Sequence, residues 1–101
     1  MIEVHETPTF SRWLRRLRDR GARARILVRI RRLSLGLSGD WRAVGEGVRK
    51  LRIDHGPGYR VYFEPRGESI VVLLAGGDKR TQPADIARAI GLAHGLDRGG
   101  R

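Results

Sequence analysis

Residues 48–53 and 59–64 alternate between apolar side chains and basic or aromatic ones. Successive side chains of a strand point to opposite faces, so the apolar positions of both segments can cover one core while the others share the second face. Cations on such a face can hold phosphates, and an aromatic ring can stack on an unpaired base. An ordinary solvated sheet face is the alternative. The side chains predicted to share this face are Lys50, Arg52, Arg60 and Tyr62.

A second basic group, Asp78-Lys79-Arg80, follows the continuous apolar segment 70–75 and the pair Gly76-Gly77. Loops at strand ends often carry functional residues, and glycine lets a ligand approach the backbone closely. Alternatively, the two glycines only turn the chain toward a last helix.

Histidine is the usual general base, and His55 borders a Gly-Pro-Gly turn beside the predicted basic face. His5 and His94 lack such a setting and are expected to be incidental. We find no His and carboxylate spacing suited to a metal, no Walker motif and no nucleophile elbow. The sequence therefore predicts neither a metal nor a cofactor.

The charge balance favours a polyanionic partner. The chain carries 21 Lys and Arg against 11 Asp and Glu, a formal net charge of +10. Arginine dominates, and its planar fork suits phosphate, although a GC-rich genome would also enrich arginine. The absence of cysteine excludes disulfides and thiolate catalysis. No apolar run approaches the ~20 residues of a membrane span, and the first residues do not resemble a signal peptide, so we expect a cytoplasmic protein with no membrane partner.

Two amphipathic helices are expected in the first third of the chain. Thr7 is the expected N-cap of the first, with Pro8 at its first helical position. Gly21 is expected to break this helix, and Gly36 to cap the second. Their apolar stripes are Phe10, Trp13, Leu14 and Leu17 in the first helix, and Ile26, Leu27, Ile30 and Leu33 in the second.

The remaining pattern predicts an N-terminal strand over residues 2–6, a loop over 36–47, and three strands with tight turns that form an antiparallel meander. Thr81 can cap a last helix, whose packing stripe is Ile86, Ala89, Ile90 and Ala93. Residues 1–101 then form a single α+β domain, with residues 95–101 expected to be a frayed tail.

Three segments together carry a resemblance to a known family: Val48–Ile53, Gly56–Phe63 and Leu74–Gln82. Of these, the strings Gly56–Phe63 and Gly76–Gln82 are specific in combination. With the opening helix they resemble the RelE/ParE superfamily of type II toxins, in its HigB/RelE-like "addiction module killer protein" branch. The resemblance runs from about Ile2 to Ala93. It implies an α+β fold in which an N-terminal strand, an α-helical hairpin packed on a small antiparallel β-meander, and a C-terminal helix follow one another.

The resemblance also implies an activity, ribosome-dependent cleavage of mRNA by an endoribonuclease (an mRNA interferase) that inhibits translation. Such cleavage uses the 2′-hydroxyl of the substrate as nucleophile and needs no metal. By position, Lys50 and Arg52 match the basic pair of the middle strand, Arg60 matches the arginine after the strand-opening tyrosine, and Lys79 or Arg80 matches the basic residue of the last loop.

One departure from RelE concerns the general base. RelE carries a tyrosine in its final segment, whereas residues 83–86 here read Pro-Ala-Asp-Ile. His55, Tyr59 or Asp85 is a candidate to assist instead, or catalysis rests on electrostatics alone, in which preorganised cations stabilise the phosphorane.

The family further implies a cognate antitoxin, commonly of the helix-turn-helix type, and contact with operator DNA only through that antitoxin. Two other functions stay open, because a fold does not determine a function. One is inhibition of DNA gyrase by a ParE-like toxin, and the other is a non-catalytic nucleic-acid-binding module.

Overall fold

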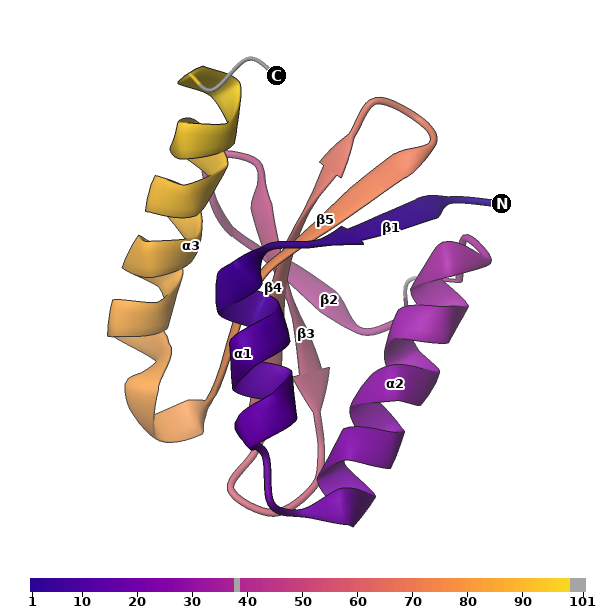
Figure 1. The fold of residues 1–101 in the computed structure, drawn as a ribbon, viewed down its shortest axis with the longest axis vertical. Helices are drawn as coiled ribbons and strands as arrows, with labels where there is room; N and C mark the ends of the chain where they lie inside the picture. The colour runs from indigo at the N-terminus through magenta and orange to yellow at the C-terminus, as the bar shows by residue number, and fades with distance from the viewer. Residues whose placement is uncertain (38, 99–101) are drawn as a thin grey trace.

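The structure, a computed structural model, describes residues 1–37 and 39–98. A five-stranded sheet in the order β1-β5-β4-β3-β2 forms its centre (Figure 1). β1 is parallel to β5, and the other neighbouring strands are antiparallel. The predicted α+β class, with an N-terminal strand and a C-terminal helix, is confirmed. The strands are β1 (Glu3–Glu6), β2 (Trp41–Gly45), β3 (Val48–Ile53), β4 (Tyr59–Arg66) and β5 (Ile70–Asp78).

Side-chain caps set the starts of the first two helices, α1 (Pro8–Arg16) and α2 (Arg20–Ser34). Thr7 caps α1 as predicted, since its hydroxyl accepts a hydrogen bond from the Phe10 N–H. The predicted break at Gly21 is wrong, because Gly21 lies in the first turn of α2. Asp19 is the N-cap there, and its carboxylate accepts from the Ala22 N–H at 3.0 Å.

α1 and α2 cover one face of the sheet (Figure 1). The predicted stripes pack there with one exception: Leu27 is 48% exposed and faces away from the sheet. The buried residues of this core are Phe10, Ile26, Leu33, Leu51, Ile53, Val61, Phe63, Val71 and Leu73.

The last helix, α3 (Gln82–Arg98), covers the opposite face, so the sheet lies between helices on both sides (Figure 1). Ala89 and Ala93 pack on Val48, Tyr62 and Leu74. The expectation that Tyr62 is available to stack on a base is wrong, because its side chain is fully buried in this second core.

The loop predicted over residues 36–47 is wrong in part. It contains β2, a short and mostly exposed edge strand that pairs with β3. A 3₁₀ turn, η1 (Lys79–Thr81), precedes α3, and its N-cap is Asp78. Thr81, the predicted cap of the last helix, is the residue directly before α3. Gly95 does not start a frayed tail, because α3 continues to Arg98; residues 99–101 of that tail lie outside the described residues. Over the described part of the chain, no helix has both the length and the hydropathy that crossing a membrane requires.

Candidate functional site

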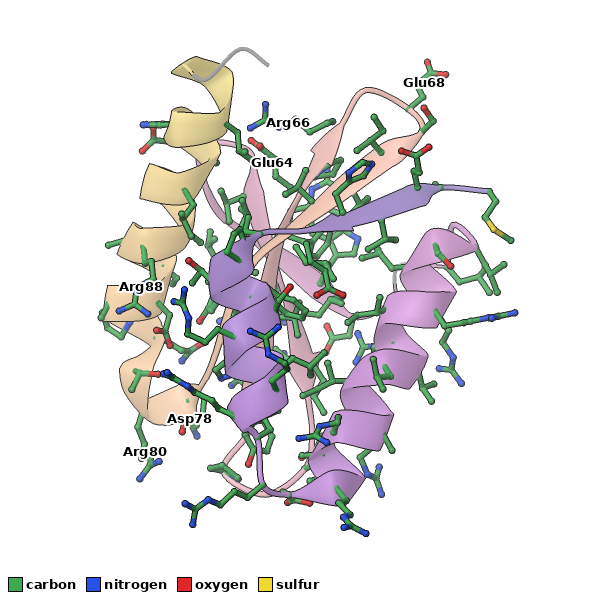
Figure 2. All side chains as sticks on the ribbon, in the orientation of Figure 1. Glu64, Arg66, Glu68, Asp78, Arg80 and Arg88 are labelled. Atoms are coloured by element: carbon green, nitrogen blue, oxygen red, sulfur yellow. The ribbon has the colours of Figure 1, made fainter. Side chains whose placement is uncertain are left out.

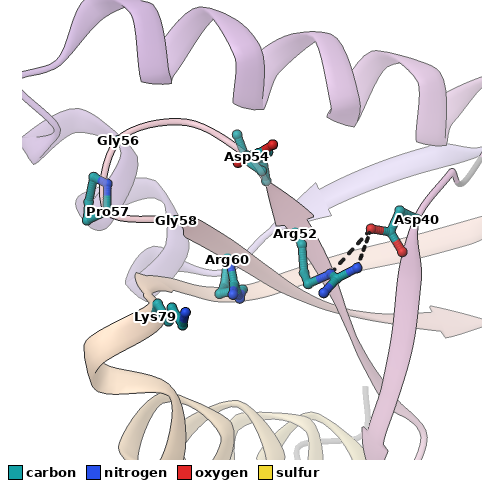
Figure 3. Close-up of a pocket in the computed structure, with 9 residues that line it drawn as sticks. Asp40, Arg52, Asp54, Gly56, Pro57, Gly58, Arg60 and Lys79 are labelled. Atoms are coloured by element: carbon teal, nitrogen blue, oxygen red, sulfur yellow. Dashed lines mark hydrogen bonds and ion pairs between the residues drawn. The ribbon is translucent and has the colours of Figure 1, made fainter.

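A cavity of about 530 Å³ opens between the end of β3, the start of β4 and η1 (Figure 3). It collects cations from three elements: Arg52 from β3, Arg60 from β4 and Lys79 from η1. All three belong to the residues predicted from sequence, so strands and loop do bring these charges together. The lining residues are Asp40, Arg52, Ile53, Asp54, Gly56, Pro57, Gly58, Arg60 and Lys79.

The register of β3 and β4 explains why the strand cations meet. Arg52 pairs directly with Arg60, and Lys50 pairs with Tyr62. Like charges that face each other across strands repel unless something compensates them. We call Lys50, Arg52, Arg60 and Lys79 the basic cluster.

Arg52 is the compensated member of the basic cluster. Its guanidinium donates to Asp40 Oδ2 from Nη2 at 2.9 Å and from Nε at 3.3 Å (Figure 3). The hydrogen bond from Arg52 lowers the pKa of Asp40, so this carboxylate is charged at neutral pH. The Arg52 side chain is therefore partly neutralised and fixed at one wall of the cavity.

Arg60 has no such compensation. It is only 9% exposed, and its Nε and Nη1 donate to Gln82 Oε1 at 3.1 Å and to the Tyr59 carbonyl at 3.2 Å. Within residues 1–37 and 39–98, no carboxylate forms an ion pair with it. A buried charge without a counter-charge is costly, so the site favours an external anion beside Arg60.

Lys50 does not line the cavity, but it is joined to Arg60 through Gln82. Its Nζ donates to Gln82 Oε1 at 2.8 Å. Partial burial lowers the pKa of Lys50, and the positive charges of Arg60, Arg52 and Arg42 lower it further. The neutral amine, which can accept a proton, is thereby easier to form.

Lys79 and Arg80 were alternatives for one role, and the structure separates them. Lys79 lines the cavity together with Arg60. Both side chains lie beside Gly58, because a Cβ added there would be 3.6 Å from Lys79 Cβ and 3.3 Å from Arg60 Nη1. Arg80 instead pairs with Asp78 at 3.0 Å and points outward with 79% of its side chain exposed (Figure 2). Arg80 is therefore outside the cavity.

The three candidates for an assisting role do not line the cavity. His55 Nε2 lies 3.1 Å from Asp19 Oδ2, at the N-cap of α2. The Tyr59 ring packs edge-on against Trp13 in the first core. Asp85 is 6% exposed and accepts a hydrogen bond from the Thr81 hydroxyl.

The explanation that Gly76-Gly77 turns the chain is wrong, because the pair lies within β5, and neither glycine lines the cavity. A Cβ on Gly76 would lie 2.2 Å from the Trp13 ring, and one on Gly77 would lie 1.9 Å from Asp85 Oδ2. The two glycines admit α1 on one face and α3 on the other. The close approach of α3 to the sheet at Gly77 brings Gln82 and η1 against the basic cluster.

Sequence reasoning missed three residues of the site. The sequence pattern assigns no role to Gln82, although Gln82 follows Lys79 by one helical turn. Asp40 and Arg42 lay in the predicted loop, yet β2 pairs Arg42 with Lys50 and so places it on the same face of the sheet. In the part of the chain that the structure describes, no group of three or more His, Asp or Glu is arranged to hold a metal ion.

Comparison with known proteins finds one nearly full-length similarity. The chain is 46% identical over 95 residues to an uncharacterized protein of Haemophilus influenzae, a match that covers 94% of this chain and 96% of that protein. No protein-family model matches the chain, and no solved structure matches it. The similarity therefore covers nearly the whole length of both proteins.

Proposed function

We propose that this chain, which belongs to one family with the uncharacterized Haemophilus influenzae protein, is the toxin of a type II toxin–antitoxin pair. Its activity is then that of a ribosome-dependent endoribonuclease that cleaves mRNA and stops translation in the cytoplasm. The resemblance to the RelE/ParE superfamily suggests this function, and the geometry of the basic cluster supports it.

One observation carries the proposal: Arg60 is nine-tenths buried, has no carboxylate partner among the described residues, and borders an open cavity. A guanidinium in that state is a prepared site for a phosphate, and Lys79 adds a second cation at the same cavity. A cation that served only solubility would be exposed, as Arg80 is.

The cluster suits phosphodiester cleavage by the 2′-hydroxyl of RNA. The 2′-oxygen forms a bond to phosphorus, and the bond from phosphorus to the 5′-oxygen of the next nucleotide breaks. Because Lys50 does not line the cavity, a bound water passes the 2′ proton to its neutral amine; Lys79 gives a proton to the leaving 5′-oxygen, and Arg60 stabilises the negative charge of the phosphorane. The products are a 2′,3′-cyclic phosphate and a 5′-hydroxyl.

The wider surface agrees with a ribosomal substrate. The net charge of +10 favours association with RNA that weakens steeply with salt. Arg42 extends the basic cluster onto the edge strand β2, along a path that a single strand of RNA can follow. We further propose a helix-turn-helix antitoxin that covers this face or packs on α1 and α2, and that brings the toxin to operator DNA.

The test is to map the 5′ ends of a defined message in a purified translation system, with and without ribosomes. We expect new ends only with ribosomes and wild-type protein. Arg60→Met should lose these ends, whereas Arg80→Met, which removes an equal charge outside the cavity, should keep them. Equal cleavage by the folded Arg60→Met protein would refute the site. An intact message combined with inhibited gyrase supercoiling would replace the function with that of a ParE-like toxin.

A further inference from the structure

We infer that Gln82 is a positioning residue: it holds the side chains of Lys50 and Arg60 next to each other without neutralising their positive charges. This inference rests on the proposed nuclease function. A single amide oxygen, Gln82 Oε1, accepts hydrogen bonds from Lys50 Nζ at 2.8 Å and from Arg60 Nε at 3.1 Å. The two cations come from different strands, and Gln82 is their common hydrogen-bond acceptor.

The orientation of the Gln82 amide is consistent with this arrangement. Its Nε2 points to the Lys79 carbonyl at 3.5 Å, a long contact that leaves Oε1 for the two cations. Gln82 is half-buried at the junction of η1 and α3. One side chain thus touches the three segments that supply Lys50, Arg60 and Lys79.

The neutral charge of Gln82 is the important chemical property. Asp40 shows within the same cavity what a carboxylate does, since it pairs with Arg52 and offsets its charge. A carboxylate at position 82 would lie against both Lys50 and Arg60. It would occupy the anion site of Arg60 and stabilise the protonated form of Lys50. A glutamine orients the same two groups and leaves their charge available to RNA.

The groups that face Lys50 show which changes would alter its proton affinity. Arg52 lies on the same strand, Arg60 on β4 and Arg42 on β2, all positive, and α3 contributes the neutral Gln82. In Gln82→Glu the only added charge is negative and adjacent, so it should raise the pKa of Lys50. In Gln82→Ala, loss of the acceptor should lower it.

The test combines Gln82→Glu with two readouts. The chain has only two lysines, Lys50 and Lys79, so an NMR titration of ¹³Cε-labelled lysine gives two signals, which Lys79→Arg assigns. We expect the Lys50 signal to titrate at higher pH in Gln82→Glu, and single-turnover cleavage on programmed ribosomes to fall at least tenfold at neutral pH. Part of the loss should be recovered at high pH.

The same variant separates a positioning role from a structural one. Glutamate is nearly isosteric with glutamine and is favoured in the first turn of a helix, so Gln82→Glu should unfold at the wild-type temperature or above it. Unchanged Lys50 titration together with wild-type cleavage would overturn the inference. If wild type cuts no message but the Lys50 pKa rises in Gln82→Glu, the nuclease function fails while the structural basis of the inference stands.

Discussion

Replacing Arg60 by methionine tests whether its charge is held at a cost to stability. Methionine is similar in length and apolar, so it can fill the same space between β4 and α3. If Arg60 serves an external phosphate, then the protein without phosphate should be more stable without this charge. An arginine retained for the fold would give the opposite result.

The structure allows the magnitude to be worked out. The variant loses hydrogen bonds to Gln82 and to the Tyr59 carbonyl, worth about 1 kcal/mol each. It is relieved of the desolvation penalty of a nine-tenths buried cation, which is several kcal/mol, and of repulsion from Arg52, its cross-strand partner. The net expectation is a gain of about 1 kcal/mol, or about 4–8 °C in Tm for a domain of this length.

The assay is urea unfolding with and without inorganic phosphate at constant ionic strength. Phosphate at ten times its Kd should stabilise the wild type by about 1.4 kcal/mol and leave Arg60→Met unaffected. Arg80→Met is the control, with a phosphate response like that of the wild type. An Arg60→Met protein that is less stable than wild type in the absence of phosphate would refute the reasoning, because Arg60 would then be part of the scaffold.

Three further predictions concern the surroundings of the site. In Gly77→Ala the new methyl group would overlap a carboxylate oxygen of α3, so thermal unfolding should show that the free energy of unfolding falls by about 1–3 kcal/mol. Gly91 lies in α3 with open space around it, so Gly91→Ala should raise the free energy of unfolding by up to about 1 kcal/mol. Equal effects of the two substitutions would contradict the packing argument. Burial raises the pKa of Tyr62 to about 12, so wild-type stability should be intact below pH 10 and decline as the pH rises toward 12. Tyr62→Phe should lack this decline, and it should be no less stable at pH 7, since the Tyr62 hydroxyl has no partner among the described residues. Matching urea midpoints for the two proteins at pH 11.5 would count against this prediction. Asp40→Asn frees Arg52 from its counter-charge and should bind a single-stranded RNA oligonucleotide severalfold more tightly by fluorescence anisotropy at low salt; weaker binding would mean that Asp40 orients Arg52 for RNA.

Alternation within strands was sufficient to predict part of the site. A period of two in β3 and β4 places Lys50, Arg52 and Arg60 on one face regardless of what covers it. The same pattern cannot say which helix packs there, and α3 buries Tyr62 while leaving Arg52 at the cavity. The burial of Tyr62 therefore depends on tertiary packing that local periodicity does not contain.

The remaining errors have separate physical causes. β2 reads Trp-Arg-Ala-Val-Gly and is a short edge strand exposed at four of its five positions, so it lacks the alternation that a half-buried strand shows. Gly21 suggests a helix break, although Asp19 two residues earlier provides the stronger signal, a side-chain cap. The role of Gln82 depends on contacts with residues 22 and 32 positions away, which only the folded chain brings together.

The most direct measurement uses ribosomes programmed with a message that carries a single 2′-deoxynucleotide at the mapped cut site. The proposed chemistry predicts that the unmodified message is cut to leave a 2′,3′-cyclic phosphate at the 3′ end of the upstream fragment, detected by mass spectrometry, and that the deoxy message stays intact. Cleavage of the deoxy message at the wild-type rate would contradict attack by the 2′-hydroxyl and, with it, the role assigned to the basic cluster.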